Sequence, residues 1–380
     1  MDRSPPALSV VLPSLNEEET IADCITKIRQ VFADLGTEGE IIIADSSRDR
    51  TPEIAASLGA IVVRPEKMGY GNAYLAGLAR ARGTYVVIGD ADNTYDFLEI
   101  PQLLAPLDAG ADMVLGSRLR GTILPGAMPA LHRYIGNPVL TWLLNRVFHT
   151  HISDSHTGFR AIRRDALECL HLKTGGMEFA SEMIIEAAIA GLRIEEVPIT
   201  YHPRLTPSKL QSFSDGWRHV RFMLLYRPVP FLAVPGLFFA FFGLSLMLLF
   251  LVRGDVETYR FHSFILASLA FIGGLEGMLM GLIIRVFSVV HGYGRQSAAI
   301  SRLLNYNILE WGIAGGSLMM TAGVIVGLGI VYQWAAAGFG SLSQIANAVW
   351  ALALFLAGIQ ILFAAVFVSM MLLKADQKEE

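Results

Sequence analysis

Four long apolar runs in the carboxyl-terminal part of the chain constrain its fold more than any other feature. They lie near residues 229–252, 263–287, 311–333 and 347–373. A helix of about 20 apolar residues crosses the hydrocarbon core of a bilayer, whereas the core of a soluble protein rarely contains such runs in series. Of the 380 residues, 53% are hydrophobic and only 17% are charged. The sequence therefore predicts a membrane domain of four helices over residues 229–380.

The charges that flank these runs predict their orientation. The segment before the first run and the loop between the second and third runs are rich in basic residues, whereas the loop between the third and fourth has no charge. Short cytosolic loops carry an excess of Lys and Arg. We therefore expect a multi-pass integral membrane protein whose amino-terminal domain and carboxyl terminus face the cytosol. The stretch from Trp217 to Arg227 mixes apolar and basic residues, which predicts an interfacial amphipathic helix over residues 211–228.

One acidic residue, Glu276, lies inside the second apolar run. An acid at this depth in a membrane is costly and usually has a partner. We expect Glu276 to form a hydrogen bond with another span rather than to serve catalysis or transport.

Composition and charge exclude some classes of function. The formal net charge of −4 argues against nucleic acid as the main partner. The two cysteines, Cys24 and Cys169, form no disulfide framework and fit a reducing cytosol. Residues 1–11 lack the charged, apolar and small-residue regions of a cleaved signal peptide, so none is expected.

The amino-terminal half alternates strand and helix signals. Short apolar runs rich in β-branched residues predict strands at residues 8–12, 40–44, 60–63, 85–89 and 112–116. Asn16 and the acids that follow it predict the capped start of a helix, and a further helix is expected over residues 72–82. Strands separated by helices indicate an α/β domain over residues 1–210, with a mostly parallel, doubly wound sheet.

Two carboxylates, Asp90 and Asp92, follow the fourth expected strand directly. Ligands of open α/β sheets bind at the carboxyl ends of the strands. Hard oxygen donors at this spacing suit Mg²⁺ or Mn²⁺ that bridges a diphosphate. On its own, the Asp-x-Asp pattern is more typical of a solvated turn. The nucleotide-domain pattern before it and the membrane domain after it favour the metal site.

Four short motifs occur in order along this domain. They are Pro13-Ser14-Leu15-Asn16-Glu17, Ala44-Asp45-Ser46-Ser47-Arg48-Asp49-Arg50-Thr51, Asp90-Ala91-Asp92 and Gly116-Ser117-Arg118. Together they resemble the family 2 glycosyltransferases with a GT-A fold, over roughly residues 8–205. The later stretches from Ser153 to Arg160 and from Met177 to Glu182 are similar to the polyprenyl-phosphate branch, the dolichol-phosphate mannose and glucose synthases. The resemblance implies a nucleotide-sugar donor, a polyprenyl-phosphate acceptor and catalysis at the membrane.

The resemblance also implies roles on the donor side. Residues expected at the nucleotide base are Pro13, Leu15, Glu17 and Asp45, the last as a hydrogen-bond acceptor. The usual second acid before Asp45 is replaced by Ala44, which leaves base selectivity open. A glycine-rich segment with Lys67 and Gly71 is expected beside the donor, since glycines let the backbone approach phosphate. Asp92, with Asp90 assisting, would hold the metal, and Arg118 suits a phosphate.

On the acceptor side, a lipid phosphate is already anionic, so cations that position it matter more than a strong base. The candidate cations are Arg133, Arg160, Arg204 and Lys209. Asp154 is the leading carboxylate for orienting or deprotonating the acceptor, and Glu182 is the alternative. The run from Leu131 to Phe148 suits either an acceptor helix that rests on the membrane or a helix packed in the core.

The resemblance thus implies an inverting hexosyltransferase that moves one sugar to a polyprenyl phosphate, and the flanking charges predict that it does so at the cytosolic face. UDP-glucose is the first choice of donor and GDP-mannose the second; whether the chain forms a homo-oligomer stays open. A processive polysaccharide synthase is disfavoured, because none of the five tryptophans follows an arginine, as the Gln-x-x-Arg-Trp motif requires. A non-catalytic scaffold or lipid transporter is disfavoured because the chain retains the acids and arginines of the motifs.

Overall fold

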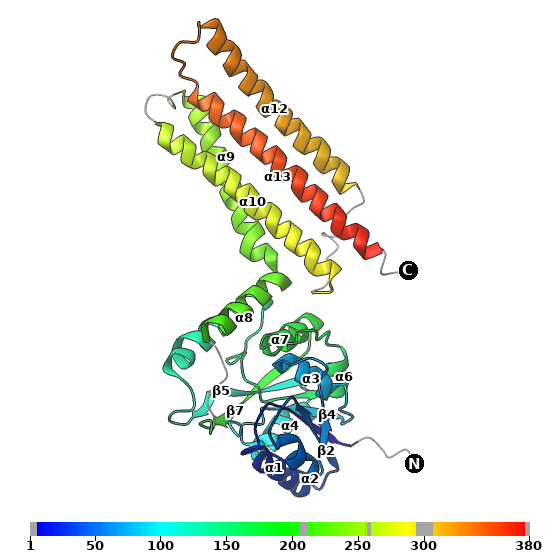
Figure 1. Ribbon diagram of the computed structural model, residues 1–380. Helices are drawn as coiled ribbons and strands as arrows, with labels where there is room; N and C mark the ends of the chain where they lie inside the picture. The colour runs from blue at the N-terminus through cyan, green and yellow to red at the C-terminus, as the bar shows by residue number, and fades with distance from the viewer. Residues whose placement is uncertain (1–5, 206–211, 255, 257–259, 294–306, 377–380) are drawn as a thin grey trace. The chain divides into compact units, whose positions relative to one another are not determined.

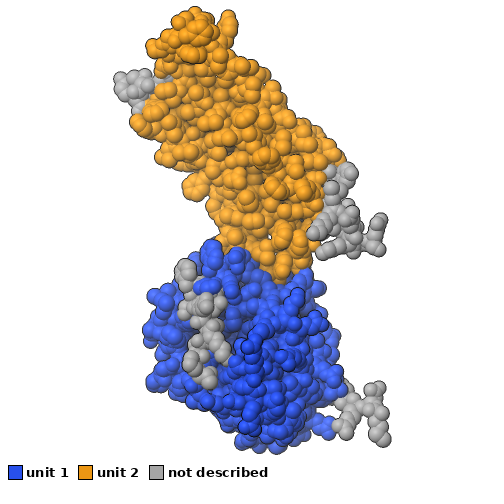
Figure 2. Space-filling view, viewed as in Figure 1, with its two compact units in different colours: residues 1–222 blue, residues 223–380 orange. Residues whose placement is uncertain are grey.

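The computed structural model describes residues 6–205, 212–254, 256, 260–293 and 307–376. The chain divides into two compact units, residues 1–222 and residues 223–380 (Figure 2). The first unit is an α/β domain and the second is a bundle of long helices (Figure 1).

The first unit is built on a seven-stranded sheet in the order β3-β2-β1-β4-β6-β5-β7. The strands are β1 (Leu8–Ser14), β2 (Gly39–Asp45), β3 (Ile61–Val63), β4 (Tyr85–Ile88), β5 (Met113–Ile123), β6 (Arg160–Arg163) and β7 (Ile194–Tyr201). Only β6 runs antiparallel to its neighbours, β4 and β5; the other pairs are parallel. The expected mostly parallel sheet of a GT-A domain is confirmed.

Helices cover both faces of this sheet. They are α1 (Ile21–Asp34), α2 (Thr51–Ser57), α3 (Tyr70–Leu78), α4 (Ile100–Asp108), α5 (Asn137–Phe148), α6 (Arg164–Glu168) and α7 (Phe179–Ala190), with a 3-10 turn Phe97–Glu99 and a π-helical turn His132–Gly136. On one face, Val10 and Leu12 join the apolar stripe of α1 in the main core. On the other face, a Cβ at Gly77 of α3 would lie 2.4 Å from Val11 Cγ1. Alternate residues of β1 therefore pack against different helix layers.

The structure differs from the sequence predictions in three local respects. Strands β6 and β7 were not among the predicted strands. The prediction of Asn16 as a helix cap is wrong, because α1 begins only at Ile21 and Asn16 lies in a left-handed conformation with φ of 54°. Helix α3 spans Tyr70–Leu78 rather than residues 72–82. The loop from Ser14 to Thr20 replaces the expected first helical turn, and its backbone is held by side chains of the loop after β2.

The sheet brings the motifs to one edge. Because β1, β2 and β4 are parallel, Ser14 pairs with Asp45 at their carboxyl ends, and Asp90 follows close to the end of β4. Strand β6 is antiparallel, so its first residue, Arg160, pairs with Ile88 at that same edge. This edge carries the candidate site.

The second unit contains four helices long and apolar enough to cross a membrane: Val229–Arg253, Phe261–Val290, Ile308–Ala336 and Ile345–Leu372. They comprise a π-helical turn (Val229–Ala233) with α9 (Val234–Arg253), then α10 (Phe261–Val290), α12 (Ile308–Ala336) and α13 (Ile345–Asp376). The bounds of these four helices lie within a few residues of the four predicted spans. Helix α8 (Ser212–Tyr226) precedes them and coincides with the amphipathic segment expected over residues 211–228.

Glycines set the close packing of the membrane helices. A Cβ at Gly274 of α10 would lie 2.2 Å from the backbone nitrogen of Ala240 in α9, and a Cβ at Gly358 of α13 would lie 2.5 Å from Gly316 O in α12. Small residues allow such helix approach in lipid. Glu276 lies on an exposed side of α10. The hydrogen bond to another span that we expected for Glu276 is not found among the described residues.

Candidate functional site

The loop after β4 holds two carboxylates in different ways. Asp90 Oδ1 accepts hydrogen bonds from the hydroxyl groups of Tyr70, at 2.9 Å, and Tyr74, at 3.3 Å. Asp92 Oδ1 accepts from the backbone nitrogen and hydroxyl of Thr94, at 3.1 and 2.6 Å. Asp92 Oδ2 accepts from Arg204, which follows β7. These contacts fix both carboxylates at the carboxyl edge of the sheet, as the sequence predicted.

The electrostatics of this pair favour a bound cation. Burial, and then the negative charge of Asp92, raise the pKa of Asp90 to about 6. A divalent cation beside the pair would relieve this repulsion, and carboxylate oxygens suit Mg²⁺ or Mn²⁺. Among the described residues, no cluster of three His, Cys, Asp or Glu side chains could hold a metal. The residues therefore fit a metal that would take its other ligands from a bound diphosphate and water.

The loops after β1 and β2 are joined into one wall. Asp45 Oδ1 accepts from Ser14 Oγ at 2.7 Å, and Asp45 Oδ2 accepts from the backbone nitrogen of Ser47 at 3.0 Å. The backbone nitrogen of Asn16 donates to Ser47 Oγ at 2.7 Å, and that of Glu17 donates to Thr51 Oγ1 at 3.0 Å. The left-handed turn at Asn16 is thus held in place by the loop after β2. The structure brings the predicted base-binding residues of both loops together.

Two further expected base contacts, Pro13 and Leu15, are partly exposed along this wall, whereas Glu17 is buried. Partial exposure leaves the two apolar side chains accessible to a planar base.

The glycine-rich segment before α3 packs closely against the loop before α7. A Cβ at Gly71 would lie 2.1 Å from Thr174 O, and the backbone nitrogen of Asn72 donates to Gly175 O at 3.2 Å. Only glycine fits at position 71, because the neighbouring atoms belong to backbone. Gly71 therefore serves this packing, while the exposed Lys67 remains able to reach a ligand.

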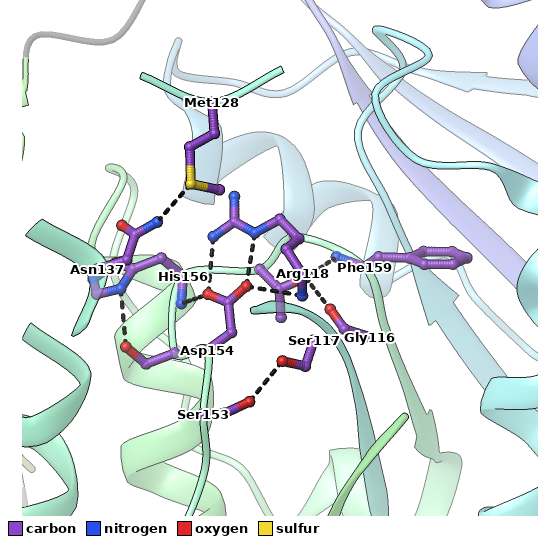
Figure 3. Close-up of polar contacts among 12 residues, drawn as sticks. Gly116, Ser117, Arg118, Met128, Asn137, Ser153, Asp154, His156 and Phe159 are labelled. Carbon is purple, nitrogen blue, oxygen red and sulfur yellow. Dashed lines mark hydrogen bonds and ion pairs between the residues drawn. The ribbon is translucent and has the colours of Figure 1, made fainter. Parts of the chain in front are cut away.

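Arg118 and Asp154 form a buried ion pair (Figure 3). Arg118 Nε donates to Asp154 Oδ2 at 2.7 Å, and a terminal nitrogen of Arg118 donates to Oδ1 at 2.9 Å. Asp154 has 0% exposure. Burial opposes its ionisation, but the charge and hydrogen bonds of Arg118 outweigh burial and lower the pKa of Asp154. An ionised, paired and inaccessible carboxylate is a weak proton acceptor, so these contacts do not favour the base role that we expected for Asp154.

Arg160 is 1% exposed and bonded to backbone carbonyls. Its three guanidinium nitrogens donate to Thr157 O at 2.9 Å, Ala180 O at 2.8 Å and Ser155 O at 3.1 Å. The side chain therefore ties the loop before β6 to α7. These contacts leave little of Arg160 for the acceptor phosphate that the sequence assigned to it.

Glu182 is also buried, with 0% exposure. It accepts hydrogen bonds from the backbone nitrogens of Lys173 and Thr174, at 3.0 and 2.9 Å, and from the hydroxyl of Thr174 at 2.6 Å. Burial raises the pKa of Glu182. Its contacts hold the loop that packs on the glycine-rich segment. Like Asp154, Glu182 is placed to support the site rather than to face an acceptor.

Three acceptor candidates remain, namely Arg133, Arg204 and Lys209. Arg133 is exposed, and its guanidinium carbon lies 5.4 Å from the centroid of the Tyr134 ring. Arg204 contacts Asp92, and Lys209 lies outside the described residues.

Helix α5 buries one of its sides in the domain, whereas Tyr134 in the turn before it is 69% exposed and Trp142 is 63% exposed. This segment thus packs on the domain with one face and presents apolar side chains with the other.

Sequence reasoning missed Tyr70 and Tyr74 as partners of Asp90. A signal was available, since Tyr70 lies in the segment expected beside the donor and Tyr74 follows it one helical turn later. Their rings form an edge-to-face pair with centroids 4.9 Å apart. Their hydroxyls point to the same carboxylate oxygen.

Comparison with known proteins gives two family matches. Residues 9–171 match glycosyl transferase family 2, and residues 282–372 match the glycosyltransferase family 2 C-terminal transmembrane region. The low-salt glycan biosynthesis hexosyltransferase Agl6 of Haloferax volcanii is 43% identical over 95% of this chain and 88% of that protein. A dolichyl-phosphate hexose transferase of the same organism is 36% identical over 55% of this chain and 89% of that protein.

Among solved structures, the chain is similar to glucosyl-3-phosphoglycerate synthase from Mycobacterium tuberculosis in complex with Mn²⁺, UDP and glucosyl-3-phosphoglycerate. The TM-score is 0.48 and the sequence identity is 25%, over 58% of this chain and 79% of that one.

Proposed function

This chain belongs to glycosyltransferase family 2, and from that premise we propose that it transfers one hexose from a nucleotide-sugar to a polyprenyl phosphate, with inversion, at the cytosolic face of a membrane. The relatives that act as hexosyltransferases support the hexose, and the dolichyl-phosphate hexose transferase supports a lipid-phosphate acceptor. The four candidate spans support a membrane-bound acceptor. UDP-glucose is the donor that we propose first, and GDP-mannose second.

One observation carries the proposal: Asp90 and Asp92 stand at the carboxyl edge of the sheet with their orientations fixed by Tyr70, Tyr74 and Thr94. A divalent metal bound there with the donor would neutralise charge on the departing nucleoside diphosphate. The wall that includes Asp45 would bind the nucleotide, which places the sugar close to the carboxylate pair. Lys67, exposed beside this wall, would add positive charge for the diphosphate.

The nucleophile in this reaction would be an oxygen of the acceptor phosphate. That oxygen attacks the anomeric carbon, the bond from that carbon to the diphosphate breaks, and the nucleoside diphosphate leaves with the bonding electrons. The acceptor oxygen is anionic at neutral pH, so no strong base is required. The buried contacts of Asp154 and Glu182 agree with this expectation. We propose Arg133 and Arg204 as the cations that orient the phosphate.

A donor screen tests the proposed function. The full-length protein in detergent would be supplied with Mg²⁺ or Mn²⁺, a short polyprenyl phosphate and one nucleotide-sugar at a time. We expect a single-sugar polyprenyl phosphate, detected by mass spectrometry, with the anomeric configuration opposite to that of the donor by NMR. The Asp92→Asn variant is the negative control. A polymeric product, or release of free sugar without lipid product, would contradict the proposal.

A further inference from the structure

Glu178 carries a carboxylate that no contact described so far uses. The residue stands immediately before α7, in the stretch Gly175-Gly176-Met177-Glu178. Its Oε2 atom is buried and has no hydrogen-bond partner among the described residues. The side chain as a whole is partly exposed. A buried carboxylate oxygen without a partner is costly, so its retention calls for a physical reason.

The ordinary structural reason for an acid at this place does not apply. An acidic residue at the start of a helix usually caps it by accepting a hydrogen bond from a backbone nitrogen. Glu178 has helical dihedral angles, φ of −61° and ψ of −14°, and its side chain makes no capping hydrogen bond. Among the described ion pairs, none includes Glu178.

The surroundings of Glu178 connect it to the carboxylate site. The ring of Phe179, the next residue, stacks on the ring of Tyr74 with centroids 5.0 Å apart. The Tyr74 hydroxyl donates to Asp90. On the other side, Gly175 O accepts from the backbone nitrogen of Asn72 in the glycine-rich segment. Glu178 therefore belongs to the wall that lies against the expected position of the donor.

The backbone also restricts where this carboxylate points. A Cβ at Gly176 would lie 2.4 Å from Glu178 Oε2 and 2.8 Å from Oε1. Because a side chain at position 176 would displace the carboxylate, glycine at this turn is required for its present position. The turn and the acid form one arrangement, directly after Gly175, whose carbonyl oxygen contacts the glycine-rich segment.

We propose that Glu178 accepts hydrogen bonds from hydroxyl groups of the donor hexose and so contributes to sugar specificity. An ionised carboxylate only accepts hydrogen bonds, and the hydroxyl groups of a neutral hexose are donors that it can pair with. The sugar would thus supply the partner that Oε2 lacks. This inference rests on the proposed function, because it requires a nucleotide-sugar donor in the site.

The test compares the binding of a nucleotide with that of the corresponding nucleotide-sugar. Calorimetry with the full-length protein in detergent and Mn²⁺ would measure UDP and UDP-glucose, or GDP and GDP-mannose if the donor screen selects mannose. Glu178→Ala and the nearly isosteric Glu178→Gln would be measured beside the wild type. Glu168→Gln is the matched control, since it removes the same charge from an exposed position in α6.

We expect Glu178→Ala to weaken nucleotide-sugar binding about 10-fold to 100-fold, as for loss of a charge-assisted hydrogen bond, with Glu178→Gln intermediate. Binding of the free nucleotide should not change, because it lacks the hexose. If Glu178→Ala weakened the binding of nucleotide and nucleotide-sugar equally, Glu178 would only support the fold. Unchanged binding of both ligands would also overturn the inference. A wild type that binds the nucleotide-sugar but transfers no sugar would contradict the proposed function alone.

Discussion

Arg204 donates two hydrogen bonds to a single oxygen of Asp92, one of them from Nε at 2.6 Å. The two residues lie 112 positions apart in the sequence. Asp92 is buried, with its other oxygen already bonded to Thr94. A metal on Asp92 and the guanidinium of Arg204 would both neutralise the charge of this carboxylate. They would therefore compete for the same oxygen.

This competition predicts that Arg204→Gln binds Mn²⁺ more tightly than the wild type in the absence of nucleotide. Removing the cation that pairs with Asp92 frees Oδ2 and removes charge repulsion, which should raise the affinity about 10-fold. Titration followed by electron paramagnetic resonance measures free Mn²⁺ directly. Arg193→Gln is the control, because Arg193 pairs with Glu195 at an exposed position. Unchanged or weaker Mn²⁺ binding by Arg204→Gln would show that the two cations do not compete.

The raised pKa of Asp90 predicts a pH dependence of metal binding. Burial and the charge of Asp92 raise this pKa to about 6, so the carboxyl takes up a proton as the pH falls through that value and can no longer bind a cation. We expect Mn²⁺ affinity to be highest above about pH 7 and to fall as the pH is lowered through about 6. Asp90→Asn should bind Mn²⁺ more weakly and lose this step. An affinity that stays constant down to about pH 5 would contradict the assignment.

The buried pair of Arg118 and Asp154 predicts a large effect on stability. Removal of one partner leaves an uncompensated buried charge, which costs about 3–5 kcal/mol. We expect Asp154→Asn and Arg118→Met to lower the apparent melting temperature by roughly 10 °C, measured by differential scanning fluorimetry. Arg163→Met breaks an exposed ion pair with Asp165 and should change the melting temperature little. If Asp154→Asn abolished turnover without any loss of stability, Asp154 would instead be the base.

The two cysteines should react very differently in the folded protein. Cys24 is buried, its Sγ donates to Ala91 O at 3.6 Å, and burial raises its pKa to about 12. Cys169 is exposed. Because the thiolate is the reactive form, iodoacetamide should modify Cys169 alone until the protein is unfolded. Peptide mass spectrometry distinguishes the two sites, and rapid labelling of Cys24 under native conditions would mean that this part of the core opens.

The exposed apolar face around α5 predicts a dependence on the membrane. Tyr134 and Trp142 are more exposed than large apolar residues usually are, and amphipathic segments of this kind bind bilayer surfaces. We expect Trp142→Ser to raise the KM for a long-chain polyprenyl phosphate in vesicles and to leave the KM for a short one in detergent unchanged. Leu35→Ser is the control, since Leu35 is exposed after α1. Equal effects on both acceptors would contradict a role at the bilayer.

Local patterns in the sequence determined much of the architecture. The four spans followed from the length of apolar runs, because the thickness of a bilayer sets the length of a helix that crosses it. Strands β1 to β5 followed from short β-branched runs, and the place of Asp90 and Asp92 followed from their position directly after β4. These features depend on neighbours within a few residues, which is why they could be predicted.

The partners of the charged residues were decided only by the tertiary structure. Asp154 pairs with a guanidinium 36 residues away, and Arg160 donates hydrogen bonds to three backbone carbonyls. Within the part of the chain that the structure describes, Oε2 of Glu178 has no hydrogen-bond partner. Strand β6 also depends on the tertiary structure, because its four residues form a strand by pairing with β4 on one side and β5 on the other. A sequence shows which side chains carry charge. Which of these charges are buried together depends on distances between segments far apart in the chain, and those distances are set by the packing of the whole domain.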